Sequence, residues 1–234
     1  MKKIIIIPTY NEKRNIRILI NKIIKLYGSK FNILIVDDNS PDGTIEQVKL
    51  LKKKYKFIDF ISRKKKLGIG SAHKTALKYV YKNKFQIVIT MDADGTHDPR
   101  FIKKFLKKIK NNDLITTNRF LKKKSLEQWP IYRQILTGFR HRLIKYVLKL
   151  PIDSSGAYRC YDLKKVKIQD ILKAKDNGYS FFWESMFILY YKKYKIYEEP
   201  IRLPFRTIGA SKMRLKDIYD ALVYLFVIYK KNFL

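Results

Sequence analysis

The chain has 234 residues, of which 46% are hydrophobic and 14% aromatic. It is long and apolar enough to bury a sizeable core, which excludes a disordered chain. Its formal net charge of +32 predicts attraction to anions such as lipid surfaces or phosphorylated substrates. The basic residues are scattered along every segment, and we find no helix-turn-helix pattern, zinc-ligand spacing or RNA-binding signature. We therefore expect no nucleic-acid partner.

The expected cellular location rests on the cysteine content and on two missing sequence features, a signal peptide and a membrane span. The one cysteine, Cys160, cannot form an internal disulfide, which fits a reducing compartment. The start MKKIIIIPTYNE has too few apolar residues before Pro8 for a signal peptide, and no segment has the roughly 18–20 apolar residues of a membrane span. We expect a cytoplasmic protein, peripheral on the cytoplasmic face of a membrane.

Short apolar runs alternate with helical patterns through the first half of the chain. The expected strands cover residues 3–8, 31–38, 57–62, 85–91 and 113–117, and the helices between them cover about 12–26, a stretch from 43, about 71–81 and a stretch after 99. This alternation predicts βαβ units and a parallel sheet. The second half is less regular, with helices expected at 132–150 and 181–194, an extended run at 195–205 and a final helix.

The stretch VITMDADGTHDP, residues 88–99, ends the fourth expected strand in two aspartates. Because side chains alternate along a strand, Asp92 and Asp94 are expected to point the same way, and their repulsion is relieved if a cation lies between them. An ordinary polar turn is the alternative, since Asp and Gly are common in turns. His97 follows, and a lone histidine in such a turn is more often a hydrogen-bonding residue than a metal ligand.

Four polar loops are expected to form one site, because ligands of parallel sheets bind outside the carboxyl ends of the strands. Tyr10 is suited to lie against a base, and Glu12 to accept hydrogen bonds from ring nitrogens. Asp38 and Asp42 suit ribose or base contacts, although Asp42 equally suits a helix cap. The glycines of LGIGSA suit a phosphate loop, which alone is a weak signal. Together the loops predict a nucleoside diphosphate with a divalent ion.

A family resemblance rests on seven segments in this order: PTYNE, VDDNSPDGT, KLGIGSA, MDADGTHDP, TNRF, SSGAYRCYD and FRTIGASK. They resemble family 2 glycosyltransferases of the GT-A fold, and among these the dolichol-phosphate and polyprenyl-phosphate mannosyltransferases. The resemblance covers about residues 3–216. It implies an α/β, Rossmann-like, mostly parallel central sheet flanked by helices, in one catalytic domain over residues 1–234. This domain would comprise a nucleotide-sugar half (1–118), an acceptor half (119–214) and a C-terminal helix (215–234).

The resemblance also implies roles for individual residues. The nucleotide-sugar set would be Pro8, Tyr10, Glu12, Asp38, Asp42, Asp92, Ala93, Arg206 and Lys212. Asp92 and Asp94 would carry Mg²⁺ or Mn²⁺ on the diphosphate. Relatives often have Gln two positions after the second aspartate, where this chain has Thr96, a poorer ligand. The catalytic set would be Asp94, Asp153, Arg119 and Arg133. The segment RTIGASK looks like a mobile loop that closes over the diphosphate.

The implied reaction is an inverting, metal-dependent transfer of a sugar, with mannose from GDP-mannose expected, to a polyprenyl or dolichyl phosphate. The alternative acceptor is a sugar hydroxyl in surface polysaccharide synthesis, which requires a general base. For the acceptor side we prefer Asp153, which with Arg159 matches a family element. Glu184, among aromatic residues, is expected to form a structural salt bridge instead.

The C-terminal helix has one predicted apolar face, made by Tyr219, Leu222, Val223, Phe226 and Val227. This face is suited to an anionic membrane surface, and some relatives continue into transmembrane helices, so a small membrane-anchoring protein is a further expected partner. Packing against the core is the alternative, since it is the commoner fate of an amphipathic helix.

Overall fold

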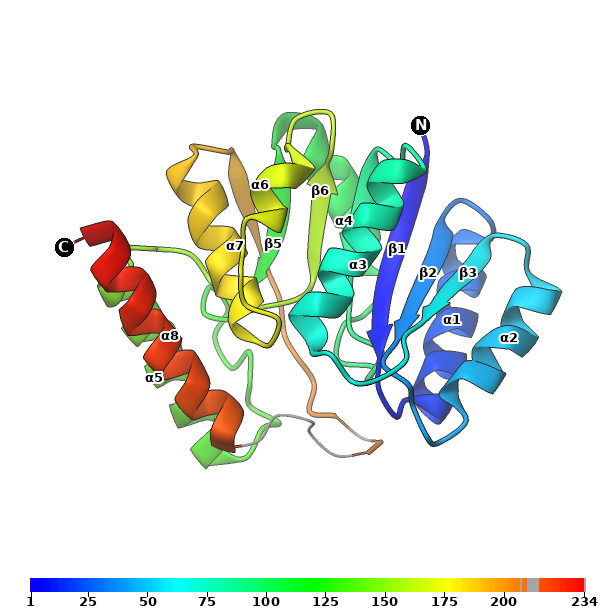
Figure 1. The fold of residues 1–234 in the computed structure, drawn as a ribbon, viewed down its shortest axis with the longest axis horizontal. Helices are drawn as coiled ribbons and strands as arrows, with labels where there is room; N and C mark the ends of the chain where they lie inside the picture. The colour runs from blue at the N-terminus through cyan, green and yellow to red at the C-terminus, as the bar shows by residue number, and fades with distance from the viewer. Residues whose placement is uncertain (207, 210–214, 234) are drawn as a thin grey trace.

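One seven-stranded sheet organises the residues that the computed structural model describes, namely 1–206, 208–209 and 215–233 (Figure 1). The strand order is β3-β2-β1-β4-β6-β5-β7. Every strand except β6 runs in the same direction, so the prediction of a mostly parallel sheet is confirmed. The strands are β1 (Lys3–Thr9), β2 (Asn32–Asp37), β3 (Ile58–Ser62), β4 (Ile87–Thr90), β5 (Leu114–Asn118), β6 (Arg159–Asp162) and β7 (Ile196–Pro200).

Helices cover both faces of this sheet. Ile4 and Ile6 of β1 belong to one hydrophobic cluster with α3, α6 and α7, and Ile5 and Ile7 belong to a second cluster with α1, α2 and α4. This division follows from the alternation of side chains along a strand. The helices are α1 (Lys13–Tyr27), α2 (Thr44–Lys54), α3 (Ile69–Lys82), α4 (Phe101–Lys108), α5 (Ile131–Val147), α6 (Ile168–Leu172), α7 (Ser180–Tyr191) and α8 (Leu215–Phe233), with a short 3₁₀ turn, η1 (Ile109–Asn111).

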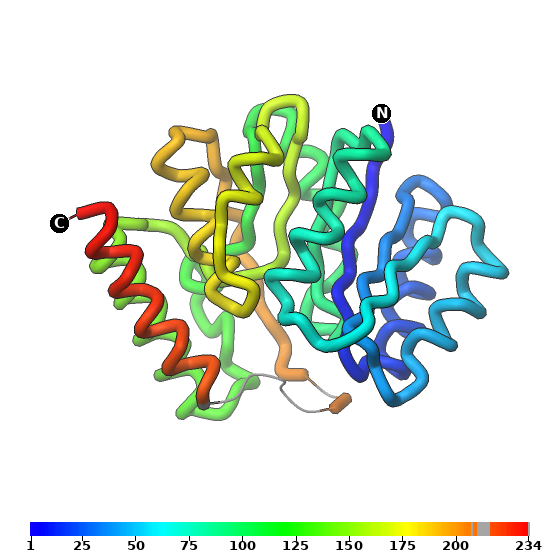
Figure 2. The backbone as a smooth tube through the Cα atoms, in the orientation of Figure 1, coloured from blue at the N-terminus to red at the C-terminus, as the bar shows by residue number. Residues whose placement is uncertain are grey.

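Helices α5 and α8 lie side by side at one end of the molecule, beyond α7 (Figures 1 and 2). Leu225 and Ile228 of α8 are buried in the same cluster as α7. Within the part of the chain that the structure describes, no helix combines the length and apolar character needed to cross a bilayer.

The strand β6 was not predicted, and it is the strand that breaks the parallel pattern. It pairs antiparallel with β4 on one side and with β5 on the other. All four of its residues are buried, so it lacks the alternation that marks a strand in a sequence. Its reversed direction brings the segment before it, which contains Asp153, to the edge where the parallel strands end.

The start of α3 packs unusually closely against the loop before α7. The backbone N–H of Ser71 donates to the carbonyl of Asn177 at 3.0 Å. A β-carbon on Gly70 would lie 2.6 Å from Cβ of Phe181 and 2.8 Å from the carbonyl oxygen of Gly178. Only glycine therefore fits this contact without movement of the backbone.

We predict that Gly70→Ala destabilises the protein by about 1–3 kcal/mol, because the added methyl group overpacks a rigid contact. The matched control is Gly138→Ala in α5, where a β-carbon meets nothing within 4 Å. This control should raise stability by about 0.5–1 kcal/mol, because alanine loses less backbone entropy in a helix. Urea unfolding of both variants measures the difference, and equal stabilities would contradict the prediction.

Candidate active site

The carboxyl ends of the parallel strands bring the predicted loops together at one edge of the sheet, the lower edge in Figure 1. Each strand is followed there by charged or aromatic side chains: Tyr10 and Glu12 after β1, Asp38 after β2, Asp92 and Asp94 after β4, and Arg119 after β5. The chain that leaves β7 brings Arg206 to the same groups, since its guanidinium contacts both Glu12 and Asp94.

The two aspartates of the DAD sequence lie in a tight turn rather than in the strand itself. Oδ1 of Asp94 accepts hydrogen bonds from the backbone N–H of Thr96 at 3.1 Å and from its hydroxyl at 2.7 Å. Gly95 supplies a φ of +83°, which favours glycine. Thr96 therefore orients Asp94, and the other carboxylate oxygen of Asp94 lies 3.8 Å from Nη1 of Arg206.

His97 stabilises this turn through a hydrogen bond to its backbone. Its Nδ1 accepts the backbone N–H of Asp92 at 2.9 Å, and its ring stacks on Tyr158 with centroids 4.8 Å apart. The Tyr158 hydroxyl in turn donates to the carbonyl of Asp98 at 2.9 Å. Burial lowers the pKa of His97, so the imidazole is neutral at pH 7 and able to accept this bond. Its Nδ1 thus serves as the hydrogen-bonding atom of the turn.

Negative charge accumulates around Asp92. Burial raises the pKa of Asp92, and the charges of Asp94 and Glu12 raise it further, while Arg206 offsets part of this effect. Among the described residues, no three His, Cys, Asp or Glu side chains are grouped so that they could hold a metal ion by themselves. Two carboxylates with unrelieved repulsion fit a divalent cation that takes its other ligands from substrate phosphates and water.

Arg206 connects the first loop to the DAD turn. Its Nη2 donates to both carboxylate oxygens of Glu12, at 2.7 and 2.8 Å, and its Nε donates to the carbonyl of Ile208 at 2.7 Å. Nδ2 of Asn15 donates to Oε2 of Glu12 at 2.6 Å. Lys212 and much of the predicted closing loop lie outside the described residues.

Asp38 is bound by a residue that the sequence analysis missed. It forms a buried ion pair with Arg63, which follows β3, and its Oδ2 accepts the backbone N–H of Leu67 at 3.1 Å. Arg63 also donates to the hydroxyl of Ser71 at 2.8 Å and to the carbonyl of Gly68 at 3.0 Å. Arg63 lies directly after a parallel strand. The rule that ligands bind beyond the carboxyl ends of such strands would therefore have indicated it as a candidate site residue.

Four more residues of the predicted site have different surroundings in the structure. Tyr10 is half-buried, with Nζ of Lys66 4.4 Å from its ring centroid. Asp42 accepts the backbone N–H groups of Lys13 and Thr44, at 3.1 and 3.0 Å, and so caps the starts of α1 and α2. Pro8 lies within β1, and the side chain of Ala93 is buried in the core.

Asp153 and Arg119 form a buried ion pair, in which 7% of the Arg119 side chain remains exposed. Nε and Nη2 of Arg119 donate to the two carboxylate oxygens at 2.8 and 2.7 Å, and the Arg119 backbone N–H donates at 3.1 Å. Burial alone would raise the pKa of Asp153, but the Arg119 charge and these hydrogen bonds lower it to about 2. Glu198, another residue that was not predicted, accepts the backbone N–H of Asp153 at 2.7 Å.

Arg133, a further predicted residue, lies on α5. Its Cζ is 5.7 Å from the centroid of the Trp129 ring.

The expected salt bridge of Glu184 is wrong, because the donors to its carboxylate are neutral groups. Its carboxylate accepts the backbone N–H groups of Lys175 and Asp176, at 2.9 and 3.0 Å, and the hydroxyl of Tyr224 at 2.9 Å. No basic side chain of the described residues forms an ion pair with it. Neutral donors thus satisfy this buried carboxylate, which ties α7 to α8 and has a structural role.

The family model described as Glycosyl transferase family 2 matches residues 4–167. The chain belongs to glycosyl transferase family 2. It is 32% identical to dolichol-phosphate mannosyltransferase of Pyrococcus furiosus over 98% of this chain and 64% of that relative, so it spans less than two thirds of its length. It is 26% identical to polyprenol monophosphomannose synthase of Mycolicibacterium smegmatis (94% and 84% covered) and to undecaprenyl-phosphate mannosyltransferase of Micrococcus luteus (95% and 92%).

Solved structures of another glycosyltransferase share the fold. Glucosyl-3-phosphoglycerate synthase from Mycobacterium tuberculosis in complex with UDP gives a TM-score of 0.66 at 14% identity, covering 98% of this chain and 80% of that chain. The same enzyme with Mn²⁺, UDP and phosphoglyceric acid gives 0.63 at 15% identity, covering 97% and 78%. The expected membership of family 2 and the expected GT-A fold are therefore confirmed.

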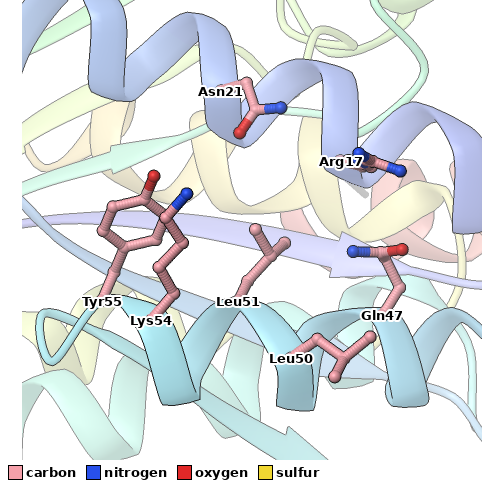
Figure 3. A pocket seen from close by; sticks show the side chains of 7 residues that line it. All are labelled: Arg17, Asn21, Gln47, Leu50, Leu51, Lys54 and Tyr55. Atoms are coloured by element: carbon pink, nitrogen blue, oxygen red, sulfur yellow. The ribbon is translucent and has the colours of Figure 1, made fainter.

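A groove outside this family 2 site lies between α1 and α2 (Figure 3). It has a volume of about 300 Å³, and side chains of the two helices face each other across it. Its lining residues are Arg17, Asn21, Gln47, Leu50, Leu51, Lys54 and Tyr55. None of them belongs to the predicted site, which lies at the sheet edge instead.

We predict that Asp153→Asn destabilises the protein by about 3–5 kcal/mol at pH 7, because it leaves the Arg119 charge buried without a counter-ion. Since the folded-state pKa of Asp153, about 2, lies below its unfolded value, its stabilisation is present at neutral pH and is lost as pH falls from about 4 towards 2. Urea unfolding between pH 7 and pH 3 should therefore show the wild-type advantage narrowing only below about pH 4. Asp220→Asn, at an exposed position of α8, is the control and should leave stability unchanged. A constant advantage across this range would contradict the assignment.

Proposed function

We propose that this chain is an inverting, metal-dependent glycosyltransferase that moves mannose from GDP-mannose to a polyprenyl or dolichyl phosphate. The observation that carries the proposal is the grouping of Asp92, Asp94 and Glu12 beside Arg206 at the carboxyl edge of the sheet. Three family relatives support the lipid-phosphate acceptor and the mannosyl donor. They are named dolichol-phosphate mannosyltransferase, polyprenol monophosphomannose synthase and undecaprenyl-phosphate mannosyltransferase.

On the donor side, Asp92 and Asp94 would hold Mg²⁺ or Mn²⁺. When bound, this ion would offset the charge that develops on the leaving nucleoside diphosphate. The Mycobacterium tuberculosis enzyme of the same fold, solved with UDP and either Mn²⁺ or Mg²⁺, supports this assignment. The Arg206 guanidinium, which lies beside Asp94, would bind diphosphate oxygens, and Lys212 would add a second positive charge.

Tyr10, with the ion pair of Asp38 and Arg63, would line the nucleoside end of the donor site. Arg63 reaches Gly68 and Ser71 of the glycine loop, so it sets the position of this loop relative to Asp38. Asp42 would contribute through the helix starts that it caps, and Pro8 and Ala93 through their backbone.

On the acceptor side, a lipid phosphate is already an anion at neutral pH and needs no general base. The state of Asp153 supports such an acceptor over a sugar hydroxyl. A carboxylate with a pKa of about 2, already bound to Arg119, is a poor proton acceptor at pH 7. In this reading Asp153 orients Arg119, and Arg119 and Arg133 bind phosphate oxygens.

The proposed membrane contact is the exposed apolar face shared by α5 and α8. On α8, the predicted apolar face is largely exposed, while Leu225 and Ile228 pack on the core from the other side. Helix α5 adds Ile131, Tyr132, Ile135, Leu136, Phe139 and Tyr146, all of which are exposed. Exposed apolar patches of this kind commonly mark membrane or protein contacts.

The basic residues of α8 support an anionic lipid surface on the cytoplasmic side of a membrane as the partner of this face. A small membrane-anchoring protein is the other proposed partner. Lys216, Lys230 and Lys231 lie exposed near the two ends of α8. Basic residues each contribute about 1 kcal/mol of attraction close to an anionic membrane.

The first test is transfer of radiolabel from GDP-mannose, UDP-glucose or UDP-N-acetylglucosamine to polyprenyl phosphate in the presence of Mg²⁺ or Mn²⁺. We expect organic-phase label with GDP-mannose alone. Asp94→Ala should reduce this label by at least about 100-fold, whereas Glu46→Ala, at an exposed position of α2, should not change it. If no donor labels the lipid but one is hydrolysed in a metal-dependent way, the lipid acceptor is wrong.

The second test concerns the apolar face. We predict that Phe139→Glu and Phe226→Glu, at side chains 58% and 52% exposed, each weaken binding to vesicles of phosphatidylglycerol and phosphatidylcholine by at least about tenfold. Leu50→Glu is the control, since Leu50 is 61% exposed but lies on α2. Vesicle flotation measures the bound fraction. Equal losses in all three variants would indicate an effect of charge alone and would contradict the proposed face.

A further inference from the structure

Arg140 of α5 lies beside the ion pair of Arg119 and Asp153. Its Nη2 donates to Oγ of Ser155 at 3.2 Å, and Nη2 of Arg119 donates to the same oxygen at 2.5 Å. Two guanidinium groups therefore meet on one hydroxyl. The Ser155 hydroxyl oxygen has two lone pairs, and these two hydrogen bonds occupy both of them.

Arg140 is the member of this group that lacks a counter-charge. No carboxylate of the described residues forms an ion pair with it, and its buried Nε finds no hydrogen-bond partner in the described part of the chain. Asp153 is already bound through both oxygens to Arg119. Burial and the nearby charge of Arg119 lower the pKa of Arg140 to about 10. A buried donor without an acceptor costs stability unless a ligand satisfies it.

Other side chains around the group do not supply the missing anion. Glu198 accepts an amide N–H of Asn118 and the backbone N–H of Asp153 through Oε1, both at 2.7 Å, and it forms no ion pair with Arg140 among the described residues. His141, the neighbour of Arg140, stacks on Phe120 with centroids 3.9 Å apart, and burial lowers its pKa. Guanidinium groups bind phosphate oxygens bidentately, and Arg140 has a buried Nε without an acceptor beside the guanidinium of Arg119.

We propose that Arg140, with Arg119 and Ser155, forms the binding site for a phosphate monoester on the acceptor. This inference deepens the proposed function and rests on it for the identity of the acceptor. Arg140 is then a binding residue that neither the sequence pattern nor the resemblance indicated. Its missing partner in the structure is the charge that the acceptor brings.

The position of Arg140 on α5 also favours a lipid source for this phosphate. The residue before it, Phe139, is exposed, and Leu136 one turn earlier belongs to the same apolar face. A phosphate bound at Arg140 therefore sits at the border of this face, where an attached prenyl chain could run along apolar side chains. A soluble phosphate monoester would gain no such contact.

The test is calorimetric titration of the full chain with farnesyl phosphate, 3-phosphoglycerate and farnesol, beside a titration with GDP-mannose. Arg140→Gln should weaken farnesyl phosphate binding by at least about tenfold. Arg140→Lys should recover part of the loss, because it restores the charge but not the planar fork. The control Arg142→Gln, at an exposed position two residues on, should bind as the wild type does. GDP-mannose binding should be the same in all variants.

The outcomes separate this inference from the proposed function. Equal binding of farnesyl phosphate by wild type and Arg140→Gln, or no binding of any phosphate monoester by the wild type, overturns the inference. Equal loss of GDP-mannose binding in Arg140→Gln also overturns it, because the residue would then have only a structural role. Arg140-dependent binding without any sugar transfer supports the phosphate site and refutes the proposed reaction. Equal affinity for 3-phosphoglycerate supports the site and assigns it a soluble acceptor.

Discussion

Pairing of buried charges governs the carboxyl edge of this sheet. Three carboxylates there are each held by an arginine: Asp38 by Arg63, Asp153 by Arg119 and Glu12 by Arg206. Burying one member of such a pair alone would cost several kcal/mol, so each pair constrains two loops at once. The pairs join the loop after β2 to the loop after β3, the loop after β1 to the chain after β7, and the loop after β5 to the segment before β6.

Among the described residues, the DAD turn and Arg140 carry charges of opposite sign that lie outside these three pairs. Burial and the like charges of Asp94 and Glu12 both raise the pKa of Asp92. Burial and the like charge of Arg119 both lower the pKa of Arg140. A protein that transfers a sugar between two phosphate-bearing molecules needs both: a place for a cation that carries the donor diphosphate, and a place for the anion of the acceptor. In the proposed reaction, these two groups would mark a donor side and an acceptor side of the edge.

Helix α5 links the acceptor side to the apolar face. Arg133 and Arg140 lie on its partly buried side, while Phe139 and its apolar neighbours are exposed on the other. Helix α8 packs beside it and is tied to α7 through the hydrogen bond between Tyr224 and Glu184. One pair of helices can therefore contact an apolar surface and place basic groups close to its polar boundary.

The sequence by itself determined the parallel sheet, the edge that carries the site and the family. The alternation of strands with helices, the polar residues after each strand and the order of the motifs can all be read along the chain. The sequence placed Asp92, Asp94 and Glu12 at that edge, and the family resemblance added Arg119 to the site. It did not identify the partners of the buried charges, since Arg63 lies 25 residues from Asp38, Arg119 lies 34 from Asp153 and Arg206 lies 194 from Glu12. Nor could local pattern show the direction of β6, the neutral partners of Glu184 or the missing partner of Arg140. Only the tertiary structure decided these, because whether a buried charge is paired depends on groups that folding brings together from distant parts of the chain.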